Sequence, residues 1–221
     1  MADLGLGGYD PAADPDPRYR RYPKGFFARM DDGPDGEFYR QPRLVTHIDQ
    51  GATDAVGRIY RLLGLTGRVL DLMSSWVSHF EDGPALLIAA GRNRPELAAN
   101  RQAAGAVVVD LNRHQVLPFA DGSFEGATCC ASVDYLVRPL EVFDEVARVL
   151  RPGAPFCVTF SNRCFPTKVI QGWAQTDDRT HVGIVADYFR ATGPWEDLRY
   201  AADGPPERRG DPLYAVWANR A

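Results

Sequence analysis

The stretch from Leu117 to Gly153 constrains the fold most, because turn, strand and helix signals follow one another in it without a gap. The turn is predicted at Asp121-Gly122, since aspartate bonds its own backbone and glycine adopts positive φ without strain. The uncharged residues 127–131 then predict a parallel strand that is buried on both faces. Apolar residues at helical spacing follow Pro139, and Pro152-Gly153 ends the helix that they predict.

Strand and helix patterns alternate along much of the chain, which favours a parallel sheet with right-handed crossovers. The sequence therefore predicts an α/β fold with a Rossmann-like, mostly parallel seven-stranded sheet flanked by helices. The strands are expected at residues 67–72, 85–90, 107–109, 127–131, 156–160, 197–201 and 213–218. The helices of this part are expected at residues 95–104, 139–151, 167–174 and 182–191.

Three segments are distinguished along the chain. Residues 1–23 are rich in proline and aspartate and have no apolar period, so we expect a flexible leader there. Between Pro42 and Gly64, apolar residues recur with a helical period, which predicts an N-terminal helical lid or lead-in over residues 24–66. Residues 67–221 are then expected to form the α/β domain.

The composition disfavours several classes of protein. With 221 residues, a formal net charge of −4 and a pI near 5.6, the chain lacks the basic character of a nucleic-acid-binding protein. No apolar run approaches the roughly 20 residues that cross a bilayer, so we expect no membrane association and a cytoplasmic location. Cysteine and histidine spacings match no metal-binding motif, so no metal is expected. We expect a small-molecule substrate and a monomer or homodimer.

The same central stretch resembles the second half of class I S-adenosylmethionine-dependent methyltransferases with a type 11-like domain. The matching residues are Leu117, Pro118, Phe119, Asp121, Gly122, Ser123, Phe124, Glu125, Glu145, Arg148, Val149, Leu150, Arg151, Pro152 and Gly153. The resemblance implies an enzyme that takes S-adenosyl-L-methionine as cofactor and transfers its methyl group to a small molecule. It also implies an antiparallel pair of strands at the C-terminal end of the sheet.

The loop after the first strand departs from that family, which has an acidic residue followed by alternating glycines, D-x-G-x-G-x-G. Asp71 is present, but Met73, Ser75 and Val77 occupy the glycine positions, so the glycine-rich loop is degenerate. Their Cβ atoms take up space through which the family's cofactor passes. The hydroxyls of Ser74 and Ser75 can hydrogen-bond a carboxylate in place of glycine N–H groups. Asp71, Met73, Ser74 and Ser75 are the cofactor-binding residues predicted here.

The next two strand ends differ in how well they match the family. Where the family has an acid for the ribose hydroxyls, this chain has Gly91, and Asn93 is predicted to bond the hydroxyls instead. After the third strand, Asp110 stands where the family's acid accepts a bond from the adenine amine, and the Leu111 N–H would meet the ring. The alternative for Asp110 is a simple turn cap. Ser132, after the fourth strand, completes the predicted cofactor-binding set.

Methyl transfer from a sulfonium needs a general base only where the acceptor arrives protonated. His79 is the first candidate, because it lies in the cofactor-facing loop and an ordinary imidazole pKa is near neutral. His47 and Tyr135 are the next candidates. For each of these residues the alternative is a structural polar or packing role.

Substrate-binding residues are expected on the lid and after the fifth strand. Tyr39 and Arg43 combine aromatic and cationic groups that suit an anionic or aromatic ligand, although a solvated helix face is the alternative. Asn162 and Arg163 follow the fifth strand, where ligands of open α/β sheets bind.

Three functions stay open at this point, because a fold does not settle a function. The first is methyl transfer to a small molecule. The second is a cyclase or lyase reaction that uses or binds the cofactor without methyl transfer. The third is a non-catalytic binding protein.

Overall fold

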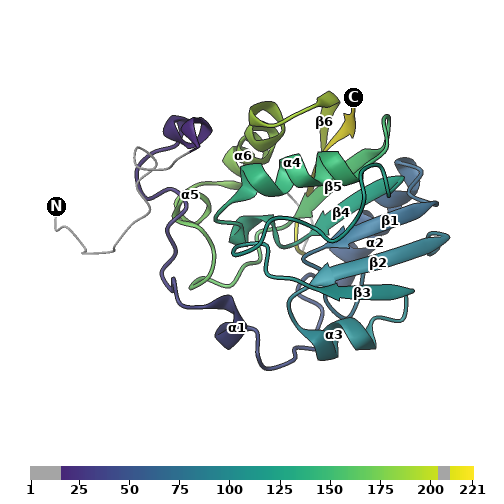
Figure 1. Cartoon of the computed structure of the whole chain (residues 1–221). Helices are drawn as coiled ribbons and strands as arrows, with labels where there is room; N and C mark the ends of the chain where they lie inside the picture. Colours follow the sequence, from purple (N-terminus) through teal and green to yellow (C-terminus); the bar gives the residue numbers. More distant parts are fainter. Residues whose placement is uncertain (1–15, 204–209) are drawn as a thin grey trace.

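The computed structural model describes residues 16–203 and 210–221, and Figure 1 shows their arrangement. Residues 1–15 of the predicted leader lie outside this described part. Among the described residues, no helix combines the length and the apolar character needed to cross a membrane.

The seven strands form one sheet in the order β3-β2-β1-β4-β5-β7-β6. Strands β1 to β5 pair in parallel, whereas β7 runs antiparallel to both β5 and β6. The predicted mostly parallel sheet and its antiparallel C-terminal pair are thus confirmed. The strands are β1 (Arg68–Leu72), β2 (Leu86–Gly91), β3 (Gly105–Val108), β4 (Gly126–Cys130), β5 (Pro155–Phe160), β6 (Trp195–Asp203) and β7 (Leu213–Arg220).

Helices cover both faces of the sheet. On one face, α4 (Pro139–Val149) and α6 (Asp178–Ala191) share an apolar core with Leu70 of β1. On the other face, α2 (Gln50–Leu62) shares a second core with Val69. Neighbouring residues of β1 thus enter opposite cores, as in a strand buried on both sides. The short elements are η1 (Pro17–Arg21), α1 (Asp35–Phe38), α3 (Arg94–Ala99), η2 (Val133–Tyr135) and α5 (Gln171–Ala174).

The predicted lead-in helix begins later than expected. Helix α2 starts at Gln50, because the Asp49 carboxylate accepts a hydrogen bond from the Ala52 N–H at 2.8 Å and caps the helix there. Leu44 and Val45 precede this cap and are 55% and 56% exposed, although the helical period placed them on a buried face. The first part of the predicted helix was therefore wrong, since an apolar period alone cannot locate a cap.

Residues 16–23 also differ from the predicted flexible leader. The 3-10 turn η1 packs onto the domain through Tyr19, which is fully buried and whose hydroxyl donates to the Glu141 carboxylate of α4. The Tyr22 hydroxyl donates to Asp187 of α6 at 2.7 Å. These aromatic anchors fix the described start of the chain against α4 and α6.

The strap, which we define as residues 24–49, lies beyond the carboxyl ends of the parallel strands, at the left of the view in Figure 1. It is tied down by Lys168, whose side chain is fully buried. The Lys168 ammonium lies 3.1 Å from the Asp31 carboxylate and 3.3 Å from that of Asp35, and it donates to the Gly33 carbonyl at 2.8 Å. Arg29 pairs with Asp35 at 2.7 Å, so the charges of this buried cluster compensate one another.

Replacing Lys168 should loosen the strap. The substitution Lys168→Met leaves buried carboxylates and carbonyls with one donor fewer, so we expect a loss of about 3–5 kcal/mol in the free energy of unfolding. Urea unfolding measures this, with Lys24→Met as the control because Lys24 is an exposed lysine of the same segment. Equal stability of the two variants would show that the cluster does not hold the strap.

Candidate functional site

A cavity of about 270 Å³ lies at the carboxyl ends of β1 to β4, under the strap. This is where open parallel sheets bind ligands. The predicted site residues that line it are Tyr39, Arg43, His47, Met73, Ser74, Ser75, Asn93, Asp110, Leu111, Ser132, Tyr135 and Arg163. Asp71, His79 and Asn162 do not line it.

The carboxylate of Asp71 is turned into the protein. It accepts hydrogen bonds from the hydroxyls of Ser74 at 2.6 Å, Ser78 at 2.7 Å and Thr128 at 2.8 Å. Burial raises the pKa of Asp71, while the three hydroxyls act in the opposite direction. The single hydrogen of the Ser74 hydroxyl is used by Asp71, so in this structure neither group is free for the role that the sequence predicted. Ser75 keeps its predicted place at the cavity wall.

Met73 occupies the position of the first family glycine and keeps a glycine-like backbone. Its φ is +51°, in the left-handed region that costs a residue with a Cβ atom about 1–2 kcal/mol. The loop thus takes a backbone conformation that glycine adopts without strain, while Met73 places a side chain on the cavity wall.

The loop after β1 also explains the missing acid at Gly91. The Ser74 N–H donates to the Ala90 carbonyl at 3.0 Å, which seats the loop on the end of β2. A Cβ atom built on Gly91 would lie 2.1 Å from the Ser74 carbonyl oxygen. No side chain fits there, so the changed loop and the absent acid are one structural feature.

Asn93 lines the cavity, but its side-chain hydrogen bonds go to α3 and to the strap. Its side-chain oxygen accepts the Glu96 N–H at 3.1 Å and caps α3, and its amide donates to the strap carbonyls of Tyr39 at 2.7 Å and Arg40 at 3.4 Å. Both amide hydrogens are thus in use. The Asn93 amide therefore has no hydrogen left to donate to a ribose hydroxyl in this structure, contrary to the predicted bond.

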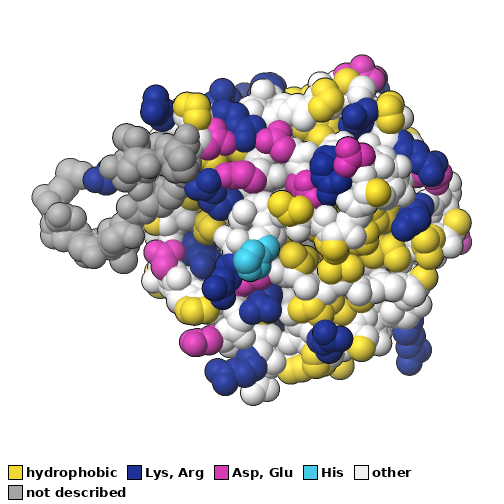
Figure 2. Space-filling model, viewed as in Figure 1, with side chains coloured by type: hydrophobic (Ala, Val, Ile, Leu, Met, Phe, Trp, Pro, Cys, Tyr) yellow, Lys and Arg dark blue, Asp and Glu magenta, His cyan; other side chains and the backbone are white. Residues whose placement is uncertain are grey.

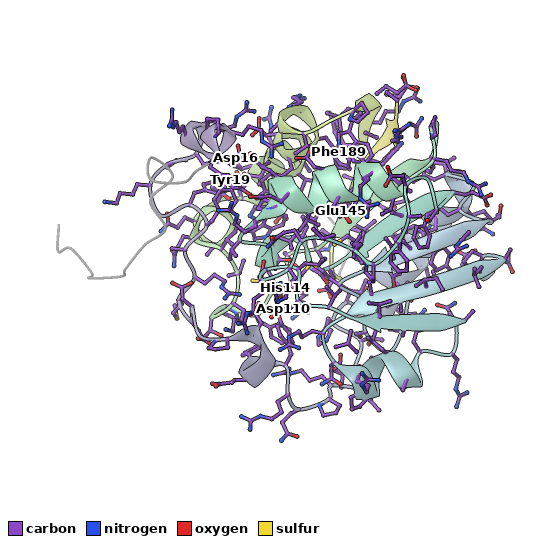
Figure 3. All side chains as sticks on the ribbon, in the orientation of Figure 1. Asp16, Tyr19, Asp110, His114, Glu145 and Phe189 are labelled. Carbon is purple, nitrogen blue, oxygen red and sulfur yellow. The ribbon has the colours of Figure 1, made fainter. Side chains whose placement is uncertain are left out.

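Asp110 faces the cavity as predicted. It lies with His114 just beyond the end of β3 in Figure 3, and the Asn112 N–H holds its Oδ1 atom at 3.2 Å. Its Oδ2 atom lies 3.3 Å from Arg92 Nε, yet it is buried and forms no hydrogen bond within the described residues. On the face in Figure 2, Lys and Arg side chains lie to the left of and below the visible histidine, together with an acidic side chain.

His79 lies outside the main cavity, in a side cavity of about 60 Å³ that His47 also lines. Its Nδ1 atom is buried and forms no hydrogen bond within the described part of the chain. Burial, with a smaller contribution from His47, lowers the pKa of His79 to about 4. The predicted near-neutral base at His79 was therefore wrong, because the imidazole is desolvated behind the loop.

The two other candidate bases do line the cavity. The His47 ring stands edge-on to Phe165 at 5.3 Å, and burial together with Arg43 lowers the pKa of His47. The Tyr135 hydroxyl accepts the Phe165 N–H at 2.8 Å, and burial raises the pKa of Tyr135 well above its ordinary value. Tyr135 is thus suited to donate a hydrogen bond rather than to accept a proton.

The predicted substrate-binding residues separate into two groups. Tyr39 and Arg43 lie at the cavity, with the Arg43 guanidinium over aromatic rings of the strap. Arg163 reaches the cavity edge but is mostly exposed and pairs with Asp211 at 2.7 Å. Asn162 is exposed and lies outside the cavity, because the chain turns away after β5.

Several cavity residues were missed by the sequence analysis. Asp35 and Asn112 line the wall and bond each other, with Asn112 Nδ2 donating at 2.9 Å. Glu96 is buried and accepts the Arg43 N–H at 2.7 Å, and burial raises the pKa of Glu96. Only Glu96 carried a sequence signal, since an acid after Asn93 and Pro95 is typical of a capped first helical turn. No group of three or more possible metal ligands gathers among the described residues.

Comparisons with known proteins agree with this geometry. A family model described as a methyltransferase domain matches residues 74–158. The biotin biosynthesis bifunctional protein BioHC of Teredinibacter turnerae is 30% identical over 80 residues, which is 34% of this chain but only 14% of that protein. The chain therefore spans a small part of this relative.

Solved structures share the fold at low sequence identity. A possible histamine N-methyltransferase from Thermotoga maritima has a TM-score of 0.57 at 13% identity, covering 78% of this chain and 91% of that one. An S-adenosylmethionine-dependent methyltransferase from Archaeoglobus fulgidus has a TM-score of 0.56 at 14% identity, covering 84% and 98%. The [4+2]-cyclase SpnF has a TM-score of 0.53 at 15% identity, covering 81% and 88%. The family model matches the middle of the chain, and the solved structures show that the chain has the fold of S-adenosylmethionine-dependent methyltransferases.

A side chain at position 91 should disturb the loop after β1. We expect Gly91→Ala to lower the free energy of unfolding by about 1–3 kcal/mol, because the added methyl meets backbone atoms that cannot rotate away. Thermal unfolding measures this. The control is Gly183→Ala in α6, where an added Cβ has no neighbour within 4 Å and should stabilise by roughly 0.5–1 kcal/mol. An unperturbed Gly91→Ala would show that the loop is not seated on β2.

Proposed function

We propose that the protein binds S-adenosyl-L-methionine in the cavity and transfers its methyl group to a small-molecule acceptor. The observation that carries the proposal is Asp110, which lines the cavity and whose buried Oδ2 atom has an ion pair with Arg92 at 3.3 Å but no hydrogen bond within the described residues. Such an oxygen costs roughly 1–3 kcal/mol when it lacks a donor, and an adenine amine would supply one. The match to a methyltransferase domain supports the same ligand.

The residues around Asp110 fit the rest of the adenine ring. The Leu111 N–H forms no hydrogen bond within the described part of the chain and would meet a ring nitrogen. The Asn112 N–H already fixes the other carboxylate oxygen, so the orientation of Asp110 is set before the ligand arrives. From here the cavity continues to Met73 and Ser132, where the methionine part would lie.

The protein's part in the reaction is placement and exclusion of water. The bound cofactor would supply an electrophilic methyl group on a sulfonium. Alignment of an acceptor with such a group contributes about 7–11 kcal/mol in well-oriented cases. Tyr39 of the strap and Phe165 form a 6.3 Å ring pair at the cavity wall, and these apolar surfaces would keep water away.

His47 is the residue that we propose to take a proton from the acceptor. Its lowered pKa keeps the imidazole neutral at pH 7, so it can accept a proton from a hydroxyl or an amine. Tyr135 would hold the acceptor by donating its hydroxyl hydrogen, since its oxygen already accepts the Phe165 N–H. His47 and Tyr135 thus have complementary proposed roles.

The acceptor is proposed to be a small molecule, since the cavity that would hold the transferred methyl group lies under the strap. The fold is also that of the [4+2]-cyclase SpnF, so binding of the cofactor alone does not define the reaction. The analysis of products therefore belongs in the test.

The test begins with calorimetric titration of S-adenosylmethionine and S-adenosylhomocysteine. Panels of phenols, amines and carboxylic acids are then incubated with the protein and methyl-labelled cofactor, and products are identified by mass spectrometry. Binding with a methylated product supports the proposal. Absence of binding overturns it, and an acceptor that changes without gaining the labelled methyl assigns a cyclase or lyase reaction instead.

Asp110→Ala should weaken binding of S-adenosylhomocysteine by roughly 1–3 kcal/mol, because the adenine amine loses its acceptor in a desolvated site. Calorimetry on the folded variant measures the dissociation constant. Asp121→Ala is the control, since the Asp121 side chain is 81% exposed and lies outside the cavity. Equal affinities of both variants and the wild type would remove Asp110 from the site.

His47→Gln should change how the rate depends on pH. Because the pKa of His47 is lowered, the wild-type kcat/KM should fall only below the ordinary imidazole pKa of about 6.5, as the base becomes protonated. The variant should be slower on the order of 100-fold and lack this acidic decline, while its affinity for S-adenosylhomocysteine is retained. His114→Gln, at an exposed histidine, is the control that should keep the decline. If the fall of kcat/KM at acidic pH persists in His47→Gln, it arises from the protonation of another group.

A further inference from the structure

Arg43 stands out among the cavity residues because its guanidinium is held in place by other contacts, with no ion pair to any described residue. The guanidinium carbon lies 4.7 Å from the ring centroid of Phe38, 5.3 Å from that of Phe165 and 5.8 Å from that of Tyr39. Nη2 donates to the Phe38 carbonyl at 3.0 Å. These contacts orient the planar group, as cation–π and stacking interactions do for arginine.

The Nη1 atom of Arg43 has no hydrogen-bond acceptor among the described residues. It is buried and forms no hydrogen bond within the described residues, although Arg43 lines the cavity. Two other arginines at the cavity lie near carboxylates, Arg92 near Asp110 and Arg163 near Asp211. Arg43 forms no ion pair within the described part of the chain, and Glu96 offsets its charge only at longer range, so the guanidinium is open to pairing with an anionic ligand.

The loop after β1 has lost donors that a ligand carboxylate would need. The Ser74 N–H is bound to the Ala90 carbonyl, and the Ser74 hydroxyl is bound to Asp71. The Ser78 hydroxyl is also bound to Asp71. Among the serine hydroxyls of this loop, that of Ser75 remains at the cavity wall, and the strap adds a guanidinium as a further donor to a carboxylate.

We propose that Arg43 binds the carboxylate of the cofactor's methionine part. The strap would then supply a hydrogen-bond donor to this carboxylate, because donors of the loop after β1 are already used within the protein. The inference rests on the proposed function. The free Nη1 donor gives a charge-assisted hydrogen bond to a carboxylate, which is about twice as strong as a neutral one. Arg43 is itself fixed by its N–H bond to Glu96 at 2.7 Å, so closing the strap brings the charge to the ligand.

The same chemistry would suit a carboxylate on the acceptor, and ligand pairs distinguish the two sources. Calorimetry compares S-adenosylhomocysteine with 5′-methylthioadenosine, which lacks the amino-acid part. Wild type, Arg43→Gln and Arg43→Lys are titrated, with Arg40→Gln as a control because Arg40 is an exposed arginine of the same strap. Circular dichroism melts establish that each variant is folded.

We expect Arg43→Gln to lower the affinity for S-adenosylhomocysteine about 10- to 100-fold and to change the affinity for 5′-methylthioadenosine by no more than about twofold. Arg43→Lys should recover part of the lost affinity. Unchanged affinity for S-adenosylhomocysteine overturns the inference, and so does an equal loss for both ligands, which would mean a general structural effect. If only the binding of a carboxylic acid that the product panel identifies as an acceptor falls, the carboxylate belongs to the acceptor and the inference is wrong. Failure of the wild type to bind either nucleoside overturns the proposed function itself.

Discussion

The arrangement of the site depends on one buried carboxylate, that of Asp71 at the end of β1. It is satisfied by hydroxyl groups from Ser74, Ser78 and Thr128. A buried carboxylate without such donors would be costly, so the loop after β1 must fold inward to supply two of them. This constraint fixes the Ser74 carbonyl against β2, and it excludes any side chain from position 91.

The two departures from the family pattern, the changed loop after β1 and the missing acid after β2, therefore have one structural cause. With the loop turned toward Asp71 and no acid after β2, the neighbouring elements bind the strap instead: Asn93 holds the Tyr39 carbonyl, and Glu96 holds the Arg43 N–H. The first turn of α3 thereby anchors the segment that covers the cavity. Asp110, which we propose to bind the adenine, lies after β3 and is not among the residues that the loop after β1 contacts.

The sheet could be predicted from the sequence because each parallel strand is a short uncharged run between turn residues, and this signal is local. Asp110 could be predicted for the same reason, as an acid directly after such a run. The roles of Asn93, Lys168 and His79 could not, because each is decided by partners far away in the chain or by burial behind a loop. The spacing of Leu44 and Val45 fits a helix, but the helix begins only after the Asp49 cap, which the spacing alone does not indicate.

The most direct test of the account is a crystal structure of the protein with S-adenosylhomocysteine. The account predicts that the adenine amine lies within hydrogen-bond distance of Asp110 Oδ2, which is buried and forms an ion pair with Arg92 but no hydrogen bond within the described residues. It also predicts that the Ser74 and Ser78 hydroxyls stay on Asp71. A ligand whose adenine lies away from Asp110, or a loop that releases Asp71 to bind the ligand, would contradict it.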